Sequence, residues 1–169
     1  LDDEKTDVLI IGGGITGLLL AYELKKQNVN YILVEQGRVC NAVTSCTTAK
    51  ITSQHGLIYN KIEKEFNLDF ARQYLNANQS AVNRYRELAE KFKCDFEEKN
   101  NYVYSVDDSD RLEKEMHTLE RIGFLADYVN TVPLPIKTVG AVRFEKQAQF
   151  NPLKLLSQLS KEEVERDEQ

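Results

Sequence analysis

The residues whose types and spacing most clearly suggest chemistry lie near the start of the chain, where four glycines fall within six positions. The segment Gly12-Gly13-Gly14-Ile15-Thr16-Gly17 fits the pattern G-x-G-x-x-G. In a strand–turn–helix context, the first glycine permits a tight turn and the second lets a pyrophosphate approach the backbone. The third lets the helix pack closely on the strand. Because amides at the start of such a helix favour an anion, the spacing predicts a pyrophosphate site formed by Gly12, Gly14, Ile15, Thr16 and Gly17.

An acidic residue follows this segment at the separation typical of dinucleotide sites. Glu35 ends the apolar run Tyr31–Val34, and a carboxylate in that position accepts hydrogen bonds from an adenosine ribose. Its charge would repel a 2′-phosphate, which argues against NADP. The glycine segment and Glu35 together predict that the chain binds the ADP half of a dinucleotide. An ordinary glycine-rich turn would not need both features.

The elements around these residues form a regular order. Residues 6–11 are an apolar, β-branched run and predict a buried strand, residues 15–28 predict a helix, and residues 31–34 predict a second strand. A strand, a glycine turn, a helix and a strand within about 30 residues make a βαβ unit. The predicted class is therefore α/β, with a Rossmann-like FAD/NAD(P)-binding fold.

The rest of the chain contains more helix than a second crossover would require. The long helix has an apolar stripe at steps of three or four residues, which predicts its buried face. The stripe comprises Phe70, Tyr74, Ala77, Ala81, Tyr85, Leu88 and Phe92. The expected order is a polar loop at 36–54, helices at 56–66 and 68–93, strands within 96–106 with a turn at 100–101, a helix capped by Asp108 or Ser109 and stopped by Gly123, a linker at 132–135, a strand at 136–144, and a helix that starts at Asn151-Pro152.

The choice between NAD and FAD depends on the segment after Glu35. An NAD-type domain would continue with another crossover and a third parallel strand, whereas residues 56–93 are mostly helical. The polar loop before them carries hydroxyl groups that suit the flavin side of a dinucleotide. The sequence therefore favours FAD, with an NAD-binding dehydrogenase domain as the alternative.

Composition limits the other functions. The chain has 169 residues, a net charge of −5 and no apolar run near the length of a membrane span. These properties argue against nucleic-acid and membrane partners. Three cysteines without a CxxC motif indicate a reducing, cytoplasmic setting. With only two histidines besides, they offer too few ligands for a zinc or iron–sulfur site.

Beyond the fingerprint, a longer pattern resembles a known family. The glycine turn, Glu35 and the loop Thr47-Thr48-Ala49-Lys50-Ile51-Thr52-Ser53-Gln54-His55-Gly56 are similar to the D-amino-acid oxidase/glycine oxidase (DAO) superfamily of FAD-dependent oxidoreductases. The loop most resembles the branch fused to a C-terminal Rieske iron–sulfur domain. A later segment, Gly140–Phe144 followed by 147–153, resembles the point where that family returns from its substrate-side sheet. The resemblance covers roughly residues 6–160.

The resemblance implies a set of contacts and a domain plan. It implies oxidation of an amine or amino-acid-like substrate, with no catalytic acid or base required of the side chains because the flavin takes the hydride. Residues 1–93 would begin the FAD-binding domain, 94–146 would start a substrate-binding β domain with one helix, and 147–169 would be a helix back to the FAD domain and a charged tail. The implied cofactor contacts are Gly12, Gly14, Ile15, Thr16 and Gly17 on the pyrophosphate, Glu35 on the ribose, Gln36 and Arg38 beside the adenosine, and Thr47, Thr48, Ala49 and Lys50 on the ribityl chain and flavin.

Departures from the family pattern leave other interpretations open. The family's FAD domain is discontinuous and this chain ends before its later segments, so we expect a truncated, N-terminal portion that lacks ligands for a Rieske cluster. A non-catalytic dinucleotide-binding module is a further alternative. Lys50 is expected either near the reduced flavin or as a solvated loop residue. His55 is interpreted as a hydrogen bonder at a helix start, and His117 as exposed. The oligomeric state stays open.

Overall fold

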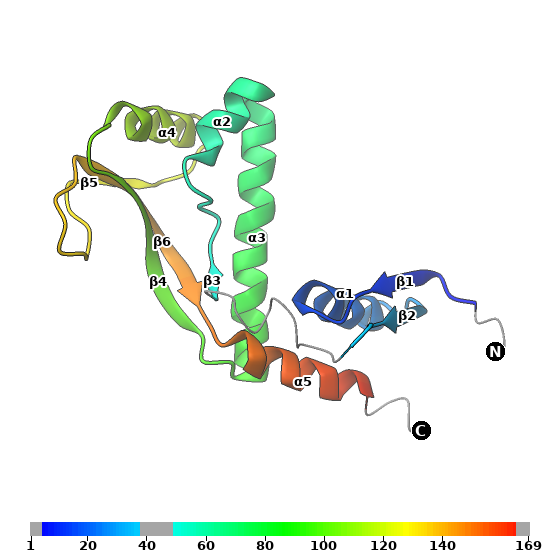
Figure 1. Ribbon diagram of the computed structural model, residues 1–169. Coiled ribbons are helices and arrows are strands. Elements are labelled where there is room, and N and C mark those ends of the chain that lie inside the picture. The colour runs from blue at the N-terminus through cyan, green and yellow to red at the C-terminus, as the bar shows by residue number, and fades with distance from the viewer. Residues whose placement is uncertain (1–4, 38–48, 165–169) are drawn as a thin grey trace. The chain divides into compact units, whose positions relative to one another are not determined.

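The computed structural model describes residues 5–37 and 49–164. The chain divides into two compact units, one of residues 1–49, 89–95 and 150–169 and one of residues 50–88 and 96–149. Figure 1 labels the elements. The first unit holds β1 (Val8–Ile11), α1 (Ile15–Lys26), β2 (Tyr31–Val34) and α5 (Pro152–Val164); the second holds β3 (Lys50–Ile51), α2 (Ile58–Glu65), β4 (Glu97–Ser105), α4 (Asp110–Arg121), β5 (Asp127–Val129) and β6 (Gly140–Gln149); α3 (Leu68–Phe92) contributes to both.

The first unit contains the predicted βαβ arrangement. β1 and β2 pair in parallel, with Val8 opposite Tyr31 and Ile11 opposite Val34, and α1 connects them. Parallel neighbours require a crossover of this kind. The predicted strand–helix–strand order is therefore confirmed, and the fold class is α/β.

Helices α1 and α5 supply most of the core of the first unit. Leu18 and Ala21 of α1 are buried, as are three leucines of α5, Leu155, Leu156 and Leu159. Burying one leucine side chain contributes about 1.5–3 kcal/mol relative to leaving it in water. Helix α5 starts as predicted, with the side-chain oxygen of Asn151 accepting a hydrogen bond from the Lys154 amide at 3.1 Å.

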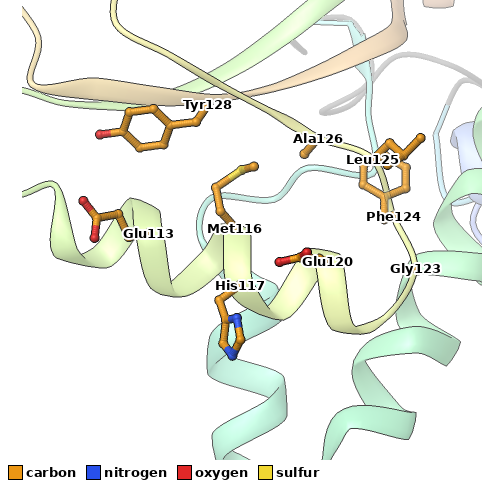
Figure 2. Close-up of a pocket in the computed structure, with 9 residues that line it drawn as sticks. All are labelled: Glu113, Met116, His117, Glu120, Gly123, Phe124, Leu125, Ala126 and Tyr128. Atoms are coloured by element: carbon orange, nitrogen blue, oxygen red, sulfur yellow. The ribbon is translucent and has the colours of Figure 1, made fainter.

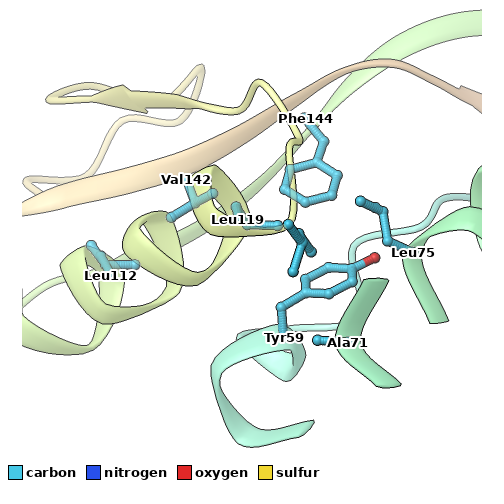
Figure 3. Packing of buried hydrophobic residues seen from close by; sticks show 8 residues of the cluster. Tyr59, Ala71, Leu75, Leu112, Leu119, Val142 and Phe144 are labelled. Carbon is cyan, nitrogen blue, oxygen red and sulfur yellow. The ribbon is translucent and has the colours of Figure 1, made fainter. Parts of the chain in front are cut away.

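The second unit is an antiparallel sheet with helices packed on it. The central strand β6 pairs with β4 along its length, with β5 near its start and with β3 near its end. Val142 and Phe144 point from β6 into a core with Tyr59 of α2, Leu75 of α3 and Leu119 of α4 (Figure 3). The sheet and three helices thus share one hydrophobic core.

A carboxylate from α4 fixes the start of α2. The side chain of Glu115 is 1% exposed, and its two oxygens accept hydrogen bonds from the amides of Tyr59 at 3.0 Å and Asn60 at 2.7 Å. These amides lie in the first turn of α2, whose N-cap Leu57 offers no side-chain acceptor. Burial raises the pKa of Glu115, although both hydrogen bonds oppose that shift. Glu115 therefore joins α2 to α4.

Several expected elements differ from the structure. The predicted polar loop at 36–54 contains the short strand β3, the predicted turn at 100–101 is an irregularity inside the single strand β4, and β5 was not predicted. The strand expected at 136–144 is β6, from 140 to 149. The predicted end at residue 144 is wrong because the charged residues Glu145 and Lys146 interrupt the alternation of apolar and polar side chains, although the strand continues beyond them. Lys146 has a φ of +54°.

The first part of the buried face of α3 is displaced by one residue from the predicted stripe, whereas Leu88 and Phe92 at its end are buried as predicted. Ala71, Leu75 and Val82 are buried, whereas Phe70 is 52% exposed. Phe70 instead stacks on Phe66 with ring centroids 5.4 Å apart. The pattern therefore predicted a core position for an aromatic residue that packs against another aromatic ring at the surface. Among the described residues, no helix has the length and apolar character needed to cross a membrane.

Candidate functional site

The glycine turn of the first unit has the geometry that the fingerprint predicts. Gly12 has a φ of +109°, which side chains rarely adopt, and its amide donates to the Val34 carbonyl at 2.8 Å. Helix α1 begins three residues later. Its N-cap Gly14 is extended and provides no side-chain hydrogen bond, and its first turn contains no acidic residue. Among the residues that the structure describes, the first amides of α1, including those of Ile15 and Thr16, thus have no side-chain acceptor.

Gly17 permits the close approach of α1 to the turn. A Cβ atom at this position would lie 1.9 Å from the Gly12 carbonyl oxygen and 3.3 Å from Cγ2 of Ile10. Both the oxygen and its carbon belong to the backbone of the turn, so no side chain could move aside to make room. The third glycine of the pattern is therefore required by packing, as the sequence predicted.

Glu35 connects the end of β2 to the glycine turn. Its Oε2 accepts a hydrogen bond from the Gly13 amide at 2.7 Å, and its Oε1 accepts one from the Gly37 amide at 2.9 Å. The bond from Gly13 contributes most, and that from Gly37 next, to a pKa of Glu35 below its usual value. The side chain is exposed and ionised at neutral pH. It keeps lone pairs free to accept hydrogen bonds from ribose hydroxyls.

The structure brings Gly12, Gly14, Ile15, Thr16, Gly17 and Glu35 together in one unit. Gln36 follows Glu35 and is exposed. Arg38, Thr47 and Thr48 lie outside the described residues. Ala49 has a φ of +56°, and Lys50 is the exposed first residue of β3 in the second unit. The roles predicted for these residues stay predictions.

The sequence did not identify Gly13 and Gly37 as partners of Glu35. Both act through the backbone amide, and the pattern leaves the second position of G-x-G-x-x-G unspecified. No side-chain signal could therefore have found them.

The described part of the loop that carried the family resemblance is held by buried amide side chains. The Ser53 amide donates to Oε1 of Gln147 at 2.8 Å, and Nε2 of Gln54 donates to the Val142 carbonyl at 2.9 Å. Nδ2 of Asn101 in turn donates to Oε1 of Gln54 at 2.7 Å. Ser53, Gln54 and Gln147 are all buried. This part of the loop is thus fixed by its own unit, through contacts that the sequence did not predict.

The two histidines have the environments that were expected. Nδ1 of His55 lies 2.7 Å from the hydroxyl of Tyr74, so His55 is a hydrogen bonder next to the start of α2. His117 is exposed on α4. Among residues 5–37 and 49–164, no three His, Cys, Asp or Glu side chains gather in a way that could hold a metal ion.

The geometry of the first unit suits the ADP half of a dinucleotide. The first turn of α1 offers amides and contains no acidic residue, the glycine turn has no side chains where a pyrophosphate would approach, and Glu35 is an ionised acceptor at the end of the adjacent strand. This combination defines a dinucleotide-binding protein.

Comparison with known proteins gives the family. The sequence pattern of the DAO family, described as FAD dependent oxidoreductase, matches residues 7–166. The chain therefore belongs to the DAO family of FAD-dependent oxidoreductases. It is 34% identical over 169 residues to YhfW of Bacillus subtilis (strain 168), whose name describes a Rieske 2Fe-2S iron-sulfur protein; the match covers 98% of this chain and 33% of YhfW.

Solved structures share the fold. L-proline dehydrogenase from P. horikoshii matches with a TM-score of 0.74 and 16% identity, over 94% of this chain and 41% of that one. L-amino acid deaminase from Proteus vulgaris gives 0.65 and 18%, over 95% and 43%. Glycine oxidase from Geobacillus kaustophilus gives 0.63 and 19%, over 93% and 44%. The chain thus spans a third of the curated relative and less than half of each of these structures.

Proposed function

We propose that this chain supplies the FAD-binding portion of an oxidoreductase that oxidises an amine or amino-acid-like substrate by hydride transfer to the flavin. The observation that carries the proposal is the ionised Glu35, hydrogen-bonded to the Gly13 amide beside the first turn of α1, which contains no acidic residue. Membership of the DAO family supports FAD as the dinucleotide. The solved structures with the same fold are named as enzymes of proline, glycine and other amino acids, which supports the substrate class.

The chain's own residues bind and orient the cofactor. The amides of α1 hold the pyrophosphate, and Glu35 accepts from the adenosine ribose. When bound, flavin supplies the hydride acceptor. The proposal also includes the contacts expected from the sequence: Gln36 and Arg38 beside the adenosine, and Thr47, Thr48, Ala49 and Lys50 on the ribityl chain and flavin. The three predicted domains and a cytoplasmic setting also stay predictions.

Nucleotide competition tests the cofactor. The purified protein is titrated into FAD while flavin fluorescence is followed, and bound FAD is then challenged with ADP, FMN or 2′-phospho-ADP. ADP should displace FAD because the described site recognises the ADP half. FMN lacks that half and 2′-phospho-ADP opposes Glu35, so both should compete poorly. Failure to bind FAD, or equal competition by FMN, would refute this assignment.

Calorimetry with NAD separates the flavin proposal from an NAD-binding dehydrogenase. The FAD proposal expects NAD to bind much more weakly than FAD, because the isoalloxazine side adds contacts that nicotinamide does not use. Tight NAD binding with no FAD uptake would favour the alternative.

Substrate oxidation is tested separately, with the FAD-loaded protein, an artificial electron acceptor, and a panel of amino acids and secondary amines. Reduction of the acceptor by an amine, but not by the matching alcohol, supports the substrate class. A protein that binds FAD and oxidises none of the panel would instead support the non-catalytic dinucleotide-binding module.

A further inference from the structure

The second unit carries an apolar groove between α4 and the segment that leads into β5. Figure 2 shows Met116 pointing from α4 towards Tyr128 of β5, with Phe124 on the connecting segment. The groove has a volume of about 570 Å³, which is enough to receive several side chains. Tyr128 is held in place, because its ring packs where a Cβ on Gly140 would lie and its hydroxyl donates to the Val139 carbonyl at 3.3 Å.

The rim of this groove exposes a large apolar side chain. Leu125 is 97% exposed, although it lies beside Phe124 and Ala126, which pack against the core. Tyr128 is 37% exposed on the same groove. An isolated exposed leucine needs no explanation. An exposed leucine at the mouth of an apolar groove indicates a surface whose burial by a partner is energetically favourable.

The groove also has a negative charge that is not neutralised within the described residues. Glu113 and Glu120 line it from α4, and neither forms an ion pair with a described residue. Arg121, on the same helix, pairs with Glu63 of α2 instead. His117 and Tyr128 are the other titratable groups that line the groove. The surface is thus apolar with two carboxylates, and it is complementary to an apolar segment that carries a cation.

The loop between β5 and β6, residues 130–139, has this complementary character. Leu134 is 51% exposed and Ile136 is 43% exposed. Lys137 follows them, is exposed, and forms no ion pair with a described residue. The loop therefore presents two apolar side chains and a positive charge in four consecutive positions.

The backbone of this loop is already ordered. The Leu134 amide donates to the Val132 carbonyl, and the Ile136 amide donates to the Leu134 carbonyl, both at 2.8 Å. These are consecutive three-residue turns, and the prolines at 133 and 135 restrict φ within them. A segment that is fixed before binding loses little conformational entropy when it docks. The loop is thus suited to insertion as a rigid unit.

We propose that the β5–β6 loop of one copy of this protein docks in the α4–β5 groove of a second copy, and that the second copy returns the same contact. Leu134 and Ile136 cover the apolar floor around Met116 and Tyr128, and Lys137 lies between Glu113 and Glu120. Each copy carries both complementary surfaces, so a two-fold axis satisfies both grooves at once. The partner is therefore a second copy of the chain.

Sedimentation velocity over a range of concentrations tests the dimer. Wild-type protein should form a dimer, and the variants Leu134→Asp and Leu125→Asp should each weaken it about tenfold or more, because each places an unpaired carboxylate in an apolar contact. Both positions are exposed, so the variants should keep the wild-type circular dichroism. Val106→Asp is the matched control, because Val106 is 58% exposed, directly follows the end of β4 and lies in neither the loop nor the groove.

Charge reversal tests the reciprocal geometry. Lys137→Glu alone and Glu113→Lys with Glu120→Lys should each give monomers. Mixing these two variants should restore a dimer, because in the mixed pair each loop meets a groove of opposite charge. Lys114→Glu controls for net charge, since Lys114 is exposed on α4 outside the groove lining.

Several results would overturn this proposal. The first is a wild-type protein that stays monomeric at all concentrations, and the second is a dimer whose affinity the groove and loop variants leave unchanged. The third is a dimer that Val106→Asp weakens as much as those variants do. The fourth is a mixture of the two charge variants that stays monomeric. None of these outcomes depends on whether the protein binds FAD.

Discussion

The packing of α1 on the glycine turn gives a sharp prediction at Gly17. In the variant Gly17→Ala, the new Cβ would lie 1.9 Å from the Gly12 carbonyl oxygen. To reach even 3.0 Å, the helix and the turn must separate by about 1.1 Å. The atoms involved are backbone, so the displacement moves the turn itself. The expected result is a folded but loosened unit whose turn no longer matches the pyrophosphate.

The size of the effect follows from two contributions. Overpacking of this kind costs about 1–3 kcal/mol of unfolding free energy. Loss of one amide hydrogen bond to a charged phosphate costs about 1.5–3 kcal/mol of binding free energy, and each 1.4 kcal/mol corresponds to about a tenfold change in Kd. We therefore expect FAD to bind roughly 10- to 100-fold more weakly.

The assay is a fluorescence titration with FAD combined with denaturant unfolding. Gly37→Ala is the matched control, because a Cβ at Gly37 would meet only Oε1 of Glu35 at 3.8 Å, an ordinary contact. The control should bind FAD as the wild type does. A Gly17→Ala variant with wild-type affinity and stability would show that close helix packing is not what this glycine provides.

Three further predictions concern single hydrogen bonds. The hydrogen bond from the Gly13 amide lowers the pKa of Glu35 in the folded protein. The ionised side chain therefore stabilises the fold at pH values above its usual pKa of 4.5, and this stabilisation is lost as the pH falls through the lowered pKa. The variant Glu35→Gln should not show this loss when the free energy of unfolding is measured against pH. Glu115→Gln places an amide donor against one amide in the first turn of α2 and should lower the unfolding free energy by about 1–3 kcal/mol. Because burial raises the pKa of Glu115, the difference in unfolding free energy between wild type and variant should decline as the pH rises through the raised pKa. A difference that does not change with pH would contradict this prediction. Tyr59→Phe leaves the Ser53 carbonyl without its donor and should cost about 1–3 kcal/mol in denaturant unfolding, whereas an unchanged midpoint would mean that this bond contributes nothing.

Local patterns predicted the elements whose causes are local. The Gly123 stop of α4 is confirmed by its φ of +82° and by the bond from the Phe124 amide to the Leu119 carbonyl at 2.9 Å. The Asp108 cap is confirmed by its bond from the Arg111 amide at 3.3 Å. In both cases the residues that interact lie within a few positions of each other, so spacing alone identifies them.

Patterns failed where a partner distant in sequence decides the structure. The strand β3 has only two residues and exists because Lys50 and Ile51 pair with Gln149 and Ala148. The face of α3 that is buried depends on which side chains meet Tyr59 and Phe144, so Ala71 is buried where the pattern had predicted Phe70. Neither partner can be inferred from the segment itself.

The sequence by itself determined the glycine turn, the two parallel strands and the position of Glu35, because these features depend on backbone freedom and short separations. Only the tertiary structure showed that Glu35 is held by the Gly13 amide and that Glu115 caps α2 from another helix. It also showed that a groove and a complementary loop lie on the same unit. The physical reason is that backbone amides and surfaces carry no residue-specific signal, so the contacts that they make exist only once the chain has folded.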